Sequence, residues 1–126
     1  MKTTISTEKA PAAIGPYSQG VDGGAVIITS GQLPIDPATG AFAGADIASQ
    51  TRQSLLNVQA VLEGAGLSMD HVIKTTVFLQ NMEDFAAMNS VYGEFFTEGK
   101  YPARSAVEVA RLPKDALVEI EAIAVR

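Results

Sequence analysis

Apolar residues recur at helical spacing in two stretches of the chain. The first stretch begins after Asp46 and ends at Gly64 and Gly66, which are typical residues for stopping a helix. In the second, Asn81 is suited to cap the first turn, and Asp84 follows shortly after it. The apolar faces of the two predicted helices contain Ile47, Thr51, Leu55, Val58 and Leu62, and Phe85, Met88, Tyr92 and Phe95.

Other stretches alternate between apolar and polar residues or are rich in β-branched ones, which predicts strands. These stretches are residues 3–7, the two halves of 18–34 that turn at Gly23 and Gly24, 71–80, 102–113 and 117–125. The predicted order is β-β-β-α-β-α-β-β, with no internal repeat or linker. We therefore expect an α+β fold, a single domain over residues 1–126 with a mixed sheet and both helices packed on one face.

The last two predicted strands place different side chains on their two faces. One face is apolar and suits packing under the helices; it contains Val107, Val109, Val118, Ile120, Ala122 and Ala124. The other face mixes charge with apolar residues; it contains Arg104, Ala106, Glu108, Ala110, Leu117, Glu119, Glu121, Ile123 and Val125. Such a mixture predicts a homo-oligomer whose sheet faces pack together, with charged clefts between subunits. In the strand 71–80, we expect Ile73, Thr75, Val77 and Leu79 on one side.

Composition limits the possible functions of the protein. Hydrophobic residues make up 47% and charged residues 18% of its 126 residues, which excludes a disordered chain. The net charge of -5 and the absence of a basic run argue against nucleic-acid binding. No stretch approaches the length of a membrane span, and residues 1–11 lack the apolar region of a signal peptide, so we expect a cytoplasmic protein.

The chain contains no cysteine and one histidine, His71. Thiol nucleophiles and thiolate metal sites are therefore excluded, and a zinc site or a Ser-His-Asp triad would depend on one ring. We expect neither a metal nor a cofactor. The chemistry must come from carboxylates, arginine, hydroxyls, backbone amides and water.

Arg104 and Glu119 are the main candidates for that chemistry. A guanidinium suits a carboxylate ligand, which it can bind with two parallel hydrogen bonds. A carboxylate near it can orient or deprotonate a water molecule. On spacing alone, a salt bridge between Arg104 and Glu108, Glu119 or Glu121 is favoured over a ligand site, and Glu121 competes with Glu119 for either role.

Weaker candidates lie in three other segments. Tyr17 follows a proline in a predicted loop and can present its hydroxyl, although most tyrosines serve in packing. Ser30 and Gly31 end a strand, where backbone amides can hold an oxygen; a bulge or plain turn is the alternative. Asn89 neighbours the apolar stripe of the second helix and could instead satisfy a buried polar group.

Four segments together resemble the RidA (YjgF) family of reactive intermediate deaminases. They are APAAIGPYSQG, VIITSGQLP, PARSAVEV and the closing LVEIEAIAV, and the resemblance extends over essentially the whole chain. It implies a chorismate-mutase-like fold and a homotrimer with a central β-barrel and pockets between subunits. It also implies hydrolysis of 2-imino acids, such as 2-iminobutanoate and 2-iminopropanoate, to 2-oxo acids and ammonia. Dehydratases that use pyridoxal phosphate release these imines, and the deaminase itself needs no cofactor.

The resemblance also implies roles for individual residues. Arg104 corresponds to the carboxylate-binding arginine and Glu119 to the glutamate that positions water. The pocket residues Tyr17, Ser30, Gly31 and Asn89 match as well, whereas Glu121 does not. Relatives often have cysteine where this chain has Ala106, and we expect this difference to change pocket shape more than activity.

Three alternatives to the deaminase stay open at this point. Some relatives have been described as ribonucleases or translation inhibitors, which the net charge of -5 disfavours. A module that binds 2-oxo acids without turnover could use the same pocket. A chaperone-like role has no specific feature in the sequence to support it.

Overall fold

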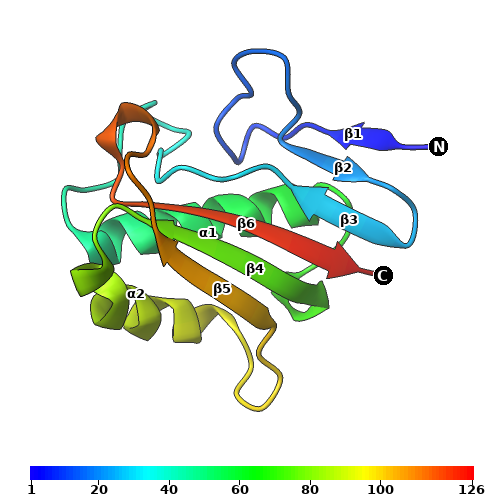
Figure 1. The fold of residues 1–126 in the computed structure, drawn as a ribbon. Coiled ribbons are helices and arrows are strands. Elements are labelled where there is room, and N and C mark those ends of the chain that lie inside the picture. Colours follow the sequence, from blue (N-terminus) through cyan, green and yellow to red (C-terminus); the bar gives the residue numbers. More distant parts are fainter.

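One mixed sheet of six strands forms the framework of the chain (Figure 1). The computed structural model describes residues 1–126. Its strands are β1 (Thr3–Ile5), β2 (Gly20–Asp22), β3 (Val26–Thr29), β4 (Val72–Leu79), β5 (Ala103–Glu108) and β6 (Val118–Val125). Its helices are α1 (Ile47–Glu63) and α2 (Phe85–Tyr92). The strand order in the sheet is β1-β2-β3-β6-β4-β5, with β4 and β5 parallel and the other neighbours antiparallel. The predicted order of elements and the α+β class are confirmed.

The caps of α1 are those that the sequence predicts. The Asp46 side chain accepts a hydrogen bond from the Ser49 backbone N–H at 2.8 Å, which satisfies one free donor of the first turn. Gly66, just beyond the helix, has a φ of 78°, a conformation that glycine adopts without strain. The apolar face of α1 is buried against the sheet, and burial of each of its leucines or valines contributes about 1.5–3 kcal/mol. That face includes Leu55, Val58, Val61 and Leu62.

The second helix starts as predicted but with a tighter first turn. Asn81 accepts a hydrogen bond from the Glu83 N–H at 2.9 Å, and a 3-10 turn over Met82–Asp84 leads into α2. Met88 and Tyr92 are buried on its inner side. Both helices pack on the same face of the sheet, and α2 lies below β4 and β5 in Figure 1. No helix is long and apolar enough to cross a membrane.

A bulge changes the predicted alternation at the start of β4. The pairing of β4 with β6 shifts between Val72 and Lys74, so Val72 is buried and Ile73 is exposed. Beyond the bulge, Thr75, Val77 and Leu79 are buried as predicted. The expectation that Ile73 shares a side with these three residues was wrong, because one extra residue in a strand reverses the direction of the side chains before it.

The predicted orientation of β5 was also wrong. Arg104 pairs with Thr75 and Ala106 with Val77, and both β4 partners are buried beneath the helices. Arg104 and Ala106 therefore face the helix side, and Val107, which is 43% exposed, lies on the open face beside Phe78. Because β5 is an edge strand and a cleft lies between it and α2, the helix side has room there for an arginine. Alternation alone shows which residues share a face, but not which face is inside.

The open face of the sheet carries both exposed apolar and polar residues. In β6, Glu119, Glu121 and Ile123 point to it, while Val118, Ile120, Ala122 and Ala124 are buried, as predicted. Exposed aliphatic side chains on this face include Val26, Ile28, Val107 and Ile123. An apolar area of this kind is typical of a surface that contacts another protein chain. The homo-oligomer stays a prediction.

Candidate functional site

The Arg104 side chain is held on the helix side of the sheet by three residues of α2. Its Nη1 donates a hydrogen bond to Asn89 Oδ1 at 2.6 Å. The guanidinium carbon lies 4.7 Å from the centre of the Tyr92 ring and 5.3 Å from that of Phe85. No ion pair joins Arg104 to a carboxylate within the chain, so the simple salt bridge favoured by spacing does not form. The guanidinium is thus positioned, with donors left for a ligand.

A cleft of about 480 Å³ lies next to this arginine. Besides Arg104, its lining consists of Asn89, Tyr92, Gly93, Tyr101 and Pro102. Ala106 lies on the same side of β5, packed at the margin of the core. Arg104 and Asn89, which were separate candidates in the sequence, are thus in direct contact.

Tyr92 and Phe85 are contacts of Arg104 that sequence reasoning treated only as core residues. The Tyr92 hydroxyl forms a buried hydrogen bond of 2.6 Å with Thr75 Oγ1, which sets the ring orientation. Burial raises the pKa of Tyr92 above its ordinary value of 10.0, so the hydroxyl stays neutral. Phe85, Asn89 and Tyr92 are spaced four and three residues apart and hence share one face of α2. That spacing was the signal that could have linked them.

Glu119 lies on the opposite face of the sheet, next to Gly31. A β-carbon at residue 31 would overlap the Glu119 carboxylate, so only glycine leaves the space that this side chain occupies. The adjoining residues Gln32 and Ile120 exchange backbone hydrogen bonds of 2.7 and 3.2 Å, which fix the segment against β6. Partial burial, and secondarily the charge of Glu121, raise the pKa of Glu119 above its ordinary value of 4.5.

Ser30 joins the Gly31 segment to the loop before β2. Its hydroxyl donates to the Ser18 carbonyl at 2.6 Å, and its backbone N–H donates to the Gln19 carbonyl at 2.9 Å. Both donors of Ser30 are therefore used within the chain, and its hydroxyl can only accept from a ligand. The Gly31 N–H has no acceptor within the chain and is the better candidate for holding a substrate oxygen.

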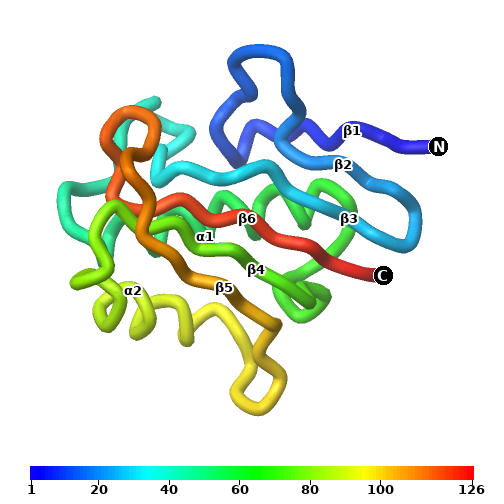
Figure 2. Tube along the Cα trace, in the orientation of Figure 1, coloured from blue at the N-terminus to red at the C-terminus, as the bar shows by residue number.

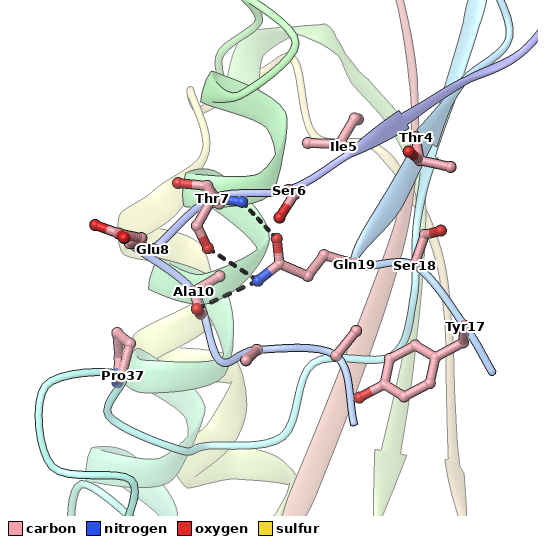
Figure 3. A pocket seen from close by; sticks show the side chains of 12 residues that line it. Thr4, Ile5, Ser6, Thr7, Glu8, Ala10, Tyr17, Ser18, Gln19 and Pro37 are labelled. Carbon is pink, nitrogen blue, oxygen red and sulfur yellow. Dashed lines mark hydrogen bonds between the residues drawn. The ribbon is translucent and has the colours of Figure 1, made fainter. Parts of the chain in front are cut away.

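Tyr17 is carried by a loop that Gln19 fastens in place (Figure 3). The Gln19 side chain is 4% exposed; its Oε1 accepts from the Thr7 N–H at 2.7 Å and its Nε2 donates to the Pro11 carbonyl at 2.7 Å. The pocket in Figure 3, about 510 Å³, lies between this loop and β1. Tyr17 itself is 52% exposed and shares a second cleft, of about 390 Å³, with Gly31.

The candidate residues thus form two groups in one chain. Arg104, Asn89 and Ala106 lie on the helix side of the sheet. Glu119 lies on the open side against Gly31, which shares its cleft with Tyr17. The expectation that Arg104 and Glu119 share a face was wrong, for the reason given for β5. Nowhere in the chain do three or more His, Cys, Asp or Glu side chains gather closely enough to hold a metal ion.

Replacing Gly31 by alanine is expected to move the Glu119 carboxylate and lower kcat. The overlap involves the end of a side chain, so Glu119 can rotate away and the fold should survive. A displacement of about 1 Å at a catalytic group costs roughly a hundredfold in rate. Steady-state kinetics together with thermal melting test this, because melting shows whether the fold survives the substitution. An unchanged kcat in Gly31→Ala would show that the Glu119 position is unimportant.

Comparison with known proteins identifies the relatives of the chain. A curated protein from Salmonella typhimurium, named 2-iminobutanoate/2-iminopropanoate deaminase, is 61% identical over 128 residues, which cover 100% of this chain and 99% of the relative. The crystal structure of the YjgF gene product from E. coli has a TM-score of 0.95 and 61% identity, covering 98% of both chains. The structure of E. coli TdcF with bound serine has a TM-score of 0.93 and 54% identity, also covering 98% of both chains.

The family model described as Endoribonuclease L-PSP matches residues 7–126. This range contains every candidate site residue described above. The family model, the similar curated proteins and the similar solved structures therefore all indicate the same family as the sequence motifs. The chain belongs to the endoribonuclease L-PSP family, which includes the RidA (YjgF) proteins that its motifs resemble.

Proposed function

We propose that the protein hydrolyses reactive 2-imino acids, 2-iminobutanoate and 2-iminopropanoate, to 2-oxo acids and ammonia. The Salmonella typhimurium protein and an Escherichia coli protein, each 61% identical over the full chain, bear the name of this activity. The reaction removes an electrophilic imine before it damages enzymes that use pyridoxal phosphate. Its proposed location is the cytoplasm.

The positioned guanidinium of Arg104 is the structural observation that carries the proposal. Asn89 takes one of its N–H donors, and the rings of Tyr92 and Phe85 set its plane, so the remaining donors can bind a carboxylate with two parallel hydrogen bonds. A 2-imino acid carries such a carboxylate beside its reacting carbon. Serine, which is bound in the structure of the related E. coli protein TdcF, likewise carries a carboxylate on its α-carbon.

The complete site is proposed to form between subunits of a homotrimer. Because Arg104 and Glu119 face opposite sides of one sheet, a single chain cannot direct both at one small substrate. Packing the apolar open faces of three copies around a central barrel would bury Val26, Ile28 and Ile123. Because β5 is an edge strand of the sheet, we propose that Arg104 of one copy reaches Glu119 of a neighbouring copy across that edge.

The proposed reaction begins with attack of water on the imine carbon. Arg104 binds the carboxylate, and Glu119 accepts a proton from the water as the new C–O bond forms. The electron pair of the C=N double bond moves to nitrogen, which takes up a proton. In the carbinolamine, the proton on oxygen is transferred to nitrogen and the C–N bond breaks. Ammonia then leaves as the C=O bond of the 2-oxo acid forms. The Gly31 N–H and the Tyr17 hydroxyl hold the developing oxygen and the substrate, while Asn89 lines the cleft around Arg104 and Ala106 lies on the same side of β5.

This chemistry requires only a modest lowering of the barrier. Imino acids already hydrolyse in water, and each tenfold acceleration corresponds to about 1.4 kcal/mol. Positioning the water and the imine in one site, together with one general base, is sufficient for such a reduction.

The proposed activity is tested by generating 2-iminobutanoate in place. A threonine dehydratase produces the imine, semicarbazide traps it, and the yield of the trapped product is compared with and without the protein. Faster loss of imine with matching release of 2-oxobutanoate supports the deaminase. Unchanged imine lifetime combined with saturable binding of 2-oxobutanoate would instead indicate a binding module, and cleavage of RNA would indicate the activity named in the family description.

A further inference from the structure

The turn before β6 contains the only two non-glycine residues of the chain with positive φ. Lys114 has a φ of 58° and a ψ of 20°, and Asp115 has a φ of 59°. Left-handed backbone is unfavourable for a residue with a β-carbon. Aspartate tolerates it better than most residues because its side chain can bond locally, but lysine has no such compensation. Strain of this kind concentrates at functional sites, which makes Lys114 the unusual residue.

The neighbours of Lys114 hold the turn in this shape. Arg111 Nε and Nη2 donate to the two carboxylate oxygens of Asp115 at 2.8 and 3.3 Å, and this ion pair keeps the pKa of Asp115 below its ordinary value. The Asp115 N–H donates to the Leu112 carbonyl at 3.1 Å. Leu112 and Ala116, on either side of the turn, are buried. The backbone at Lys114 is therefore determined by its surroundings.

The side chain of Lys114 contributes to two adjoining clefts. One is the cleft of about 390 Å³ that also contains Tyr17 and Gly31, and the other is a groove of about 240 Å³ that contains Ile14 and Ile35. In both, Lys114 is the one charged residue of the lining. Figure 2 shows the same proximity in the chain trace, where the turn after β5, in orange, lies beside the loop after β3, in cyan.

The ammonium group of Lys114 makes no ion pair within the chain. Lys114 is exposed, and the other residues that line its two clefts are apolar or neutral, so no carboxylate of the lining neutralises its charge. The chain as a whole carries a net charge of -5, which repels anions. A free cation at this place therefore provides a local attraction for anions at the Tyr17–Gly31 cleft.

We propose that Lys114 attracts the anionic substrate into the Tyr17–Gly31 cleft, as a second cation in addition to Arg104. The turn is kept strained because its backbone directs the ammonium group there. This inference rests on the proposed function for the identity of the anion. It assigns Lys114 to capture of the substrate and not to the chemical step. Lys114 should therefore affect kcat/KM and leave kcat nearly unchanged.

The test compares Lys114→Gln, which removes the charge, with Lys114→Arg, which keeps it. Lys2→Gln is the matched control, because Lys2 is exposed and precedes β1, and the N-terminus lies far from the turn in Figure 2. Imine hydrolysis and 2-oxobutanoate binding are measured from low ionic strength to about 1 M salt, where the screening length is about 3 Å. We expect Lys114→Gln to lower kcat/KM and weaken binding by about three- to tenfold at low salt. The difference should vanish at high salt, and Lys114→Arg should behave like the unmodified protein.

A third variant, Lys114→Gly, separates this role from a structural one. Glycine relieves the backbone strain, so Tm should rise by roughly 2–4 °C while kcat/KM falls as in Lys114→Gln. The inference would be overturned if kcat/KM depended on salt equally in Lys114→Gln and Lys2→Gln. It would also be overturned if Lys114→Gly kept the kcat/KM of the unmodified protein, or if Lys114→Gln or Lys114→Gly dissociated the assembly. If the unmodified protein binds 2-oxobutanoate through Lys114 but does not hydrolyse the imine, the proposed function fails and the anion site stands.

Discussion

Replacing Arg104 by alanine is expected to lower kcat/KM for 2-iminobutanoate by about a hundredfold to a thousandfold. The substitution removes both the charge and the two parallel hydrogen bonds that fix the carboxylate, so the imine carbon is no longer held near the attacking water. The fold should remain, because Arg104 is only partly buried and its contacts are confined to one face of α2. Steady-state kinetics measure the loss of kcat/KM, melting curves test the fold, and sedimentation tests the assembly.

Two further variants sharpen this result. Arg104→Lys keeps a charge but loses the planar arrangement of donors and the stacking on Tyr92 and Phe85, so it should recover only a small part of the rate. Arg52→Ala removes an exposed ion pair with Glu94 and should have no effect on turnover. Unmodified rates in Arg104→Ala would contradict the role of Arg104 as the carboxylate-binding residue.

The second large effect is expected in Glu119→Gln, which should lower kcat by about a hundredfold or more while 2-oxobutanoate still binds. Glutamine keeps the size and hydrogen-bonding capacity of the side chain but cannot accept a proton from water. Isothermal titration with 2-oxobutanoate and kinetics with the imine separate binding from turnover. Undiminished kcat would assign the proton transfer to another group, and Glu121→Gln would then be the next variant to measure.

The raised pKa of Glu119 gives this prediction a dependence on pH. Turnover needs the ionised carboxylate, so activity should fall on acidification through a pKa above the ordinary glutamate value of 4.5. Because the pKa is higher in the folded chain, the folded state binds the proton more tightly than the unfolded state does. The stability from this group is therefore fully present below pH 4.5 and is lost as the pH rises through the folded pKa.

At neutral pH, the ionised Glu119 thus destabilises the fold relative to a neutral side chain of the same size. Where the chain is monomeric and no neighbouring Arg104 reaches Glu119, Glu119→Gln should accordingly have a higher Tm than the unmodified protein at pH 7 and an equal Tm at low pH. Melting curves across the pH range measure this difference. A lower Tm of the variant at pH 7 would show that the carboxylate is stabilised in the fold, contrary to the direction of its pKa.

The sequence predicted the elements well because their signals are local. Asp46 and Gly66 mark the ends of α1 through a side-chain cap and a left-handed backbone, each of which involves only neighbouring residues. The faces of β6 were also correct, because four buried apolar residues alternate there with a second set that includes two glutamates. Such strong alternation leaves one assignment of the core face.

The site was harder to predict because its contacts connect distant segments. In β5 the apolar residues occur on both faces, so Val107 was assigned to the core and Arg104 to the open side. The register with Thr75 and Val77 of β4 determines the true orientation, and no pattern within β5 contains it. The side-chain hydrogen bonds of Gln19 with the Thr7–Pro11 segment likewise lie outside any periodic signal.

The central claim is that Arg104 and Glu119 act together from different copies of the chain. Mixing Arg104→Ala with Glu119→Gln after unfolding and refolding tests it most directly, because each variant alone should be nearly inactive. In randomly mixed trimers, about one quarter of the clefts combine an intact arginine from one copy with an intact glutamate from its neighbour. We therefore predict recovery of about one quarter of the unmodified activity. A mixture as inactive as its components would contradict a site shared between subunits.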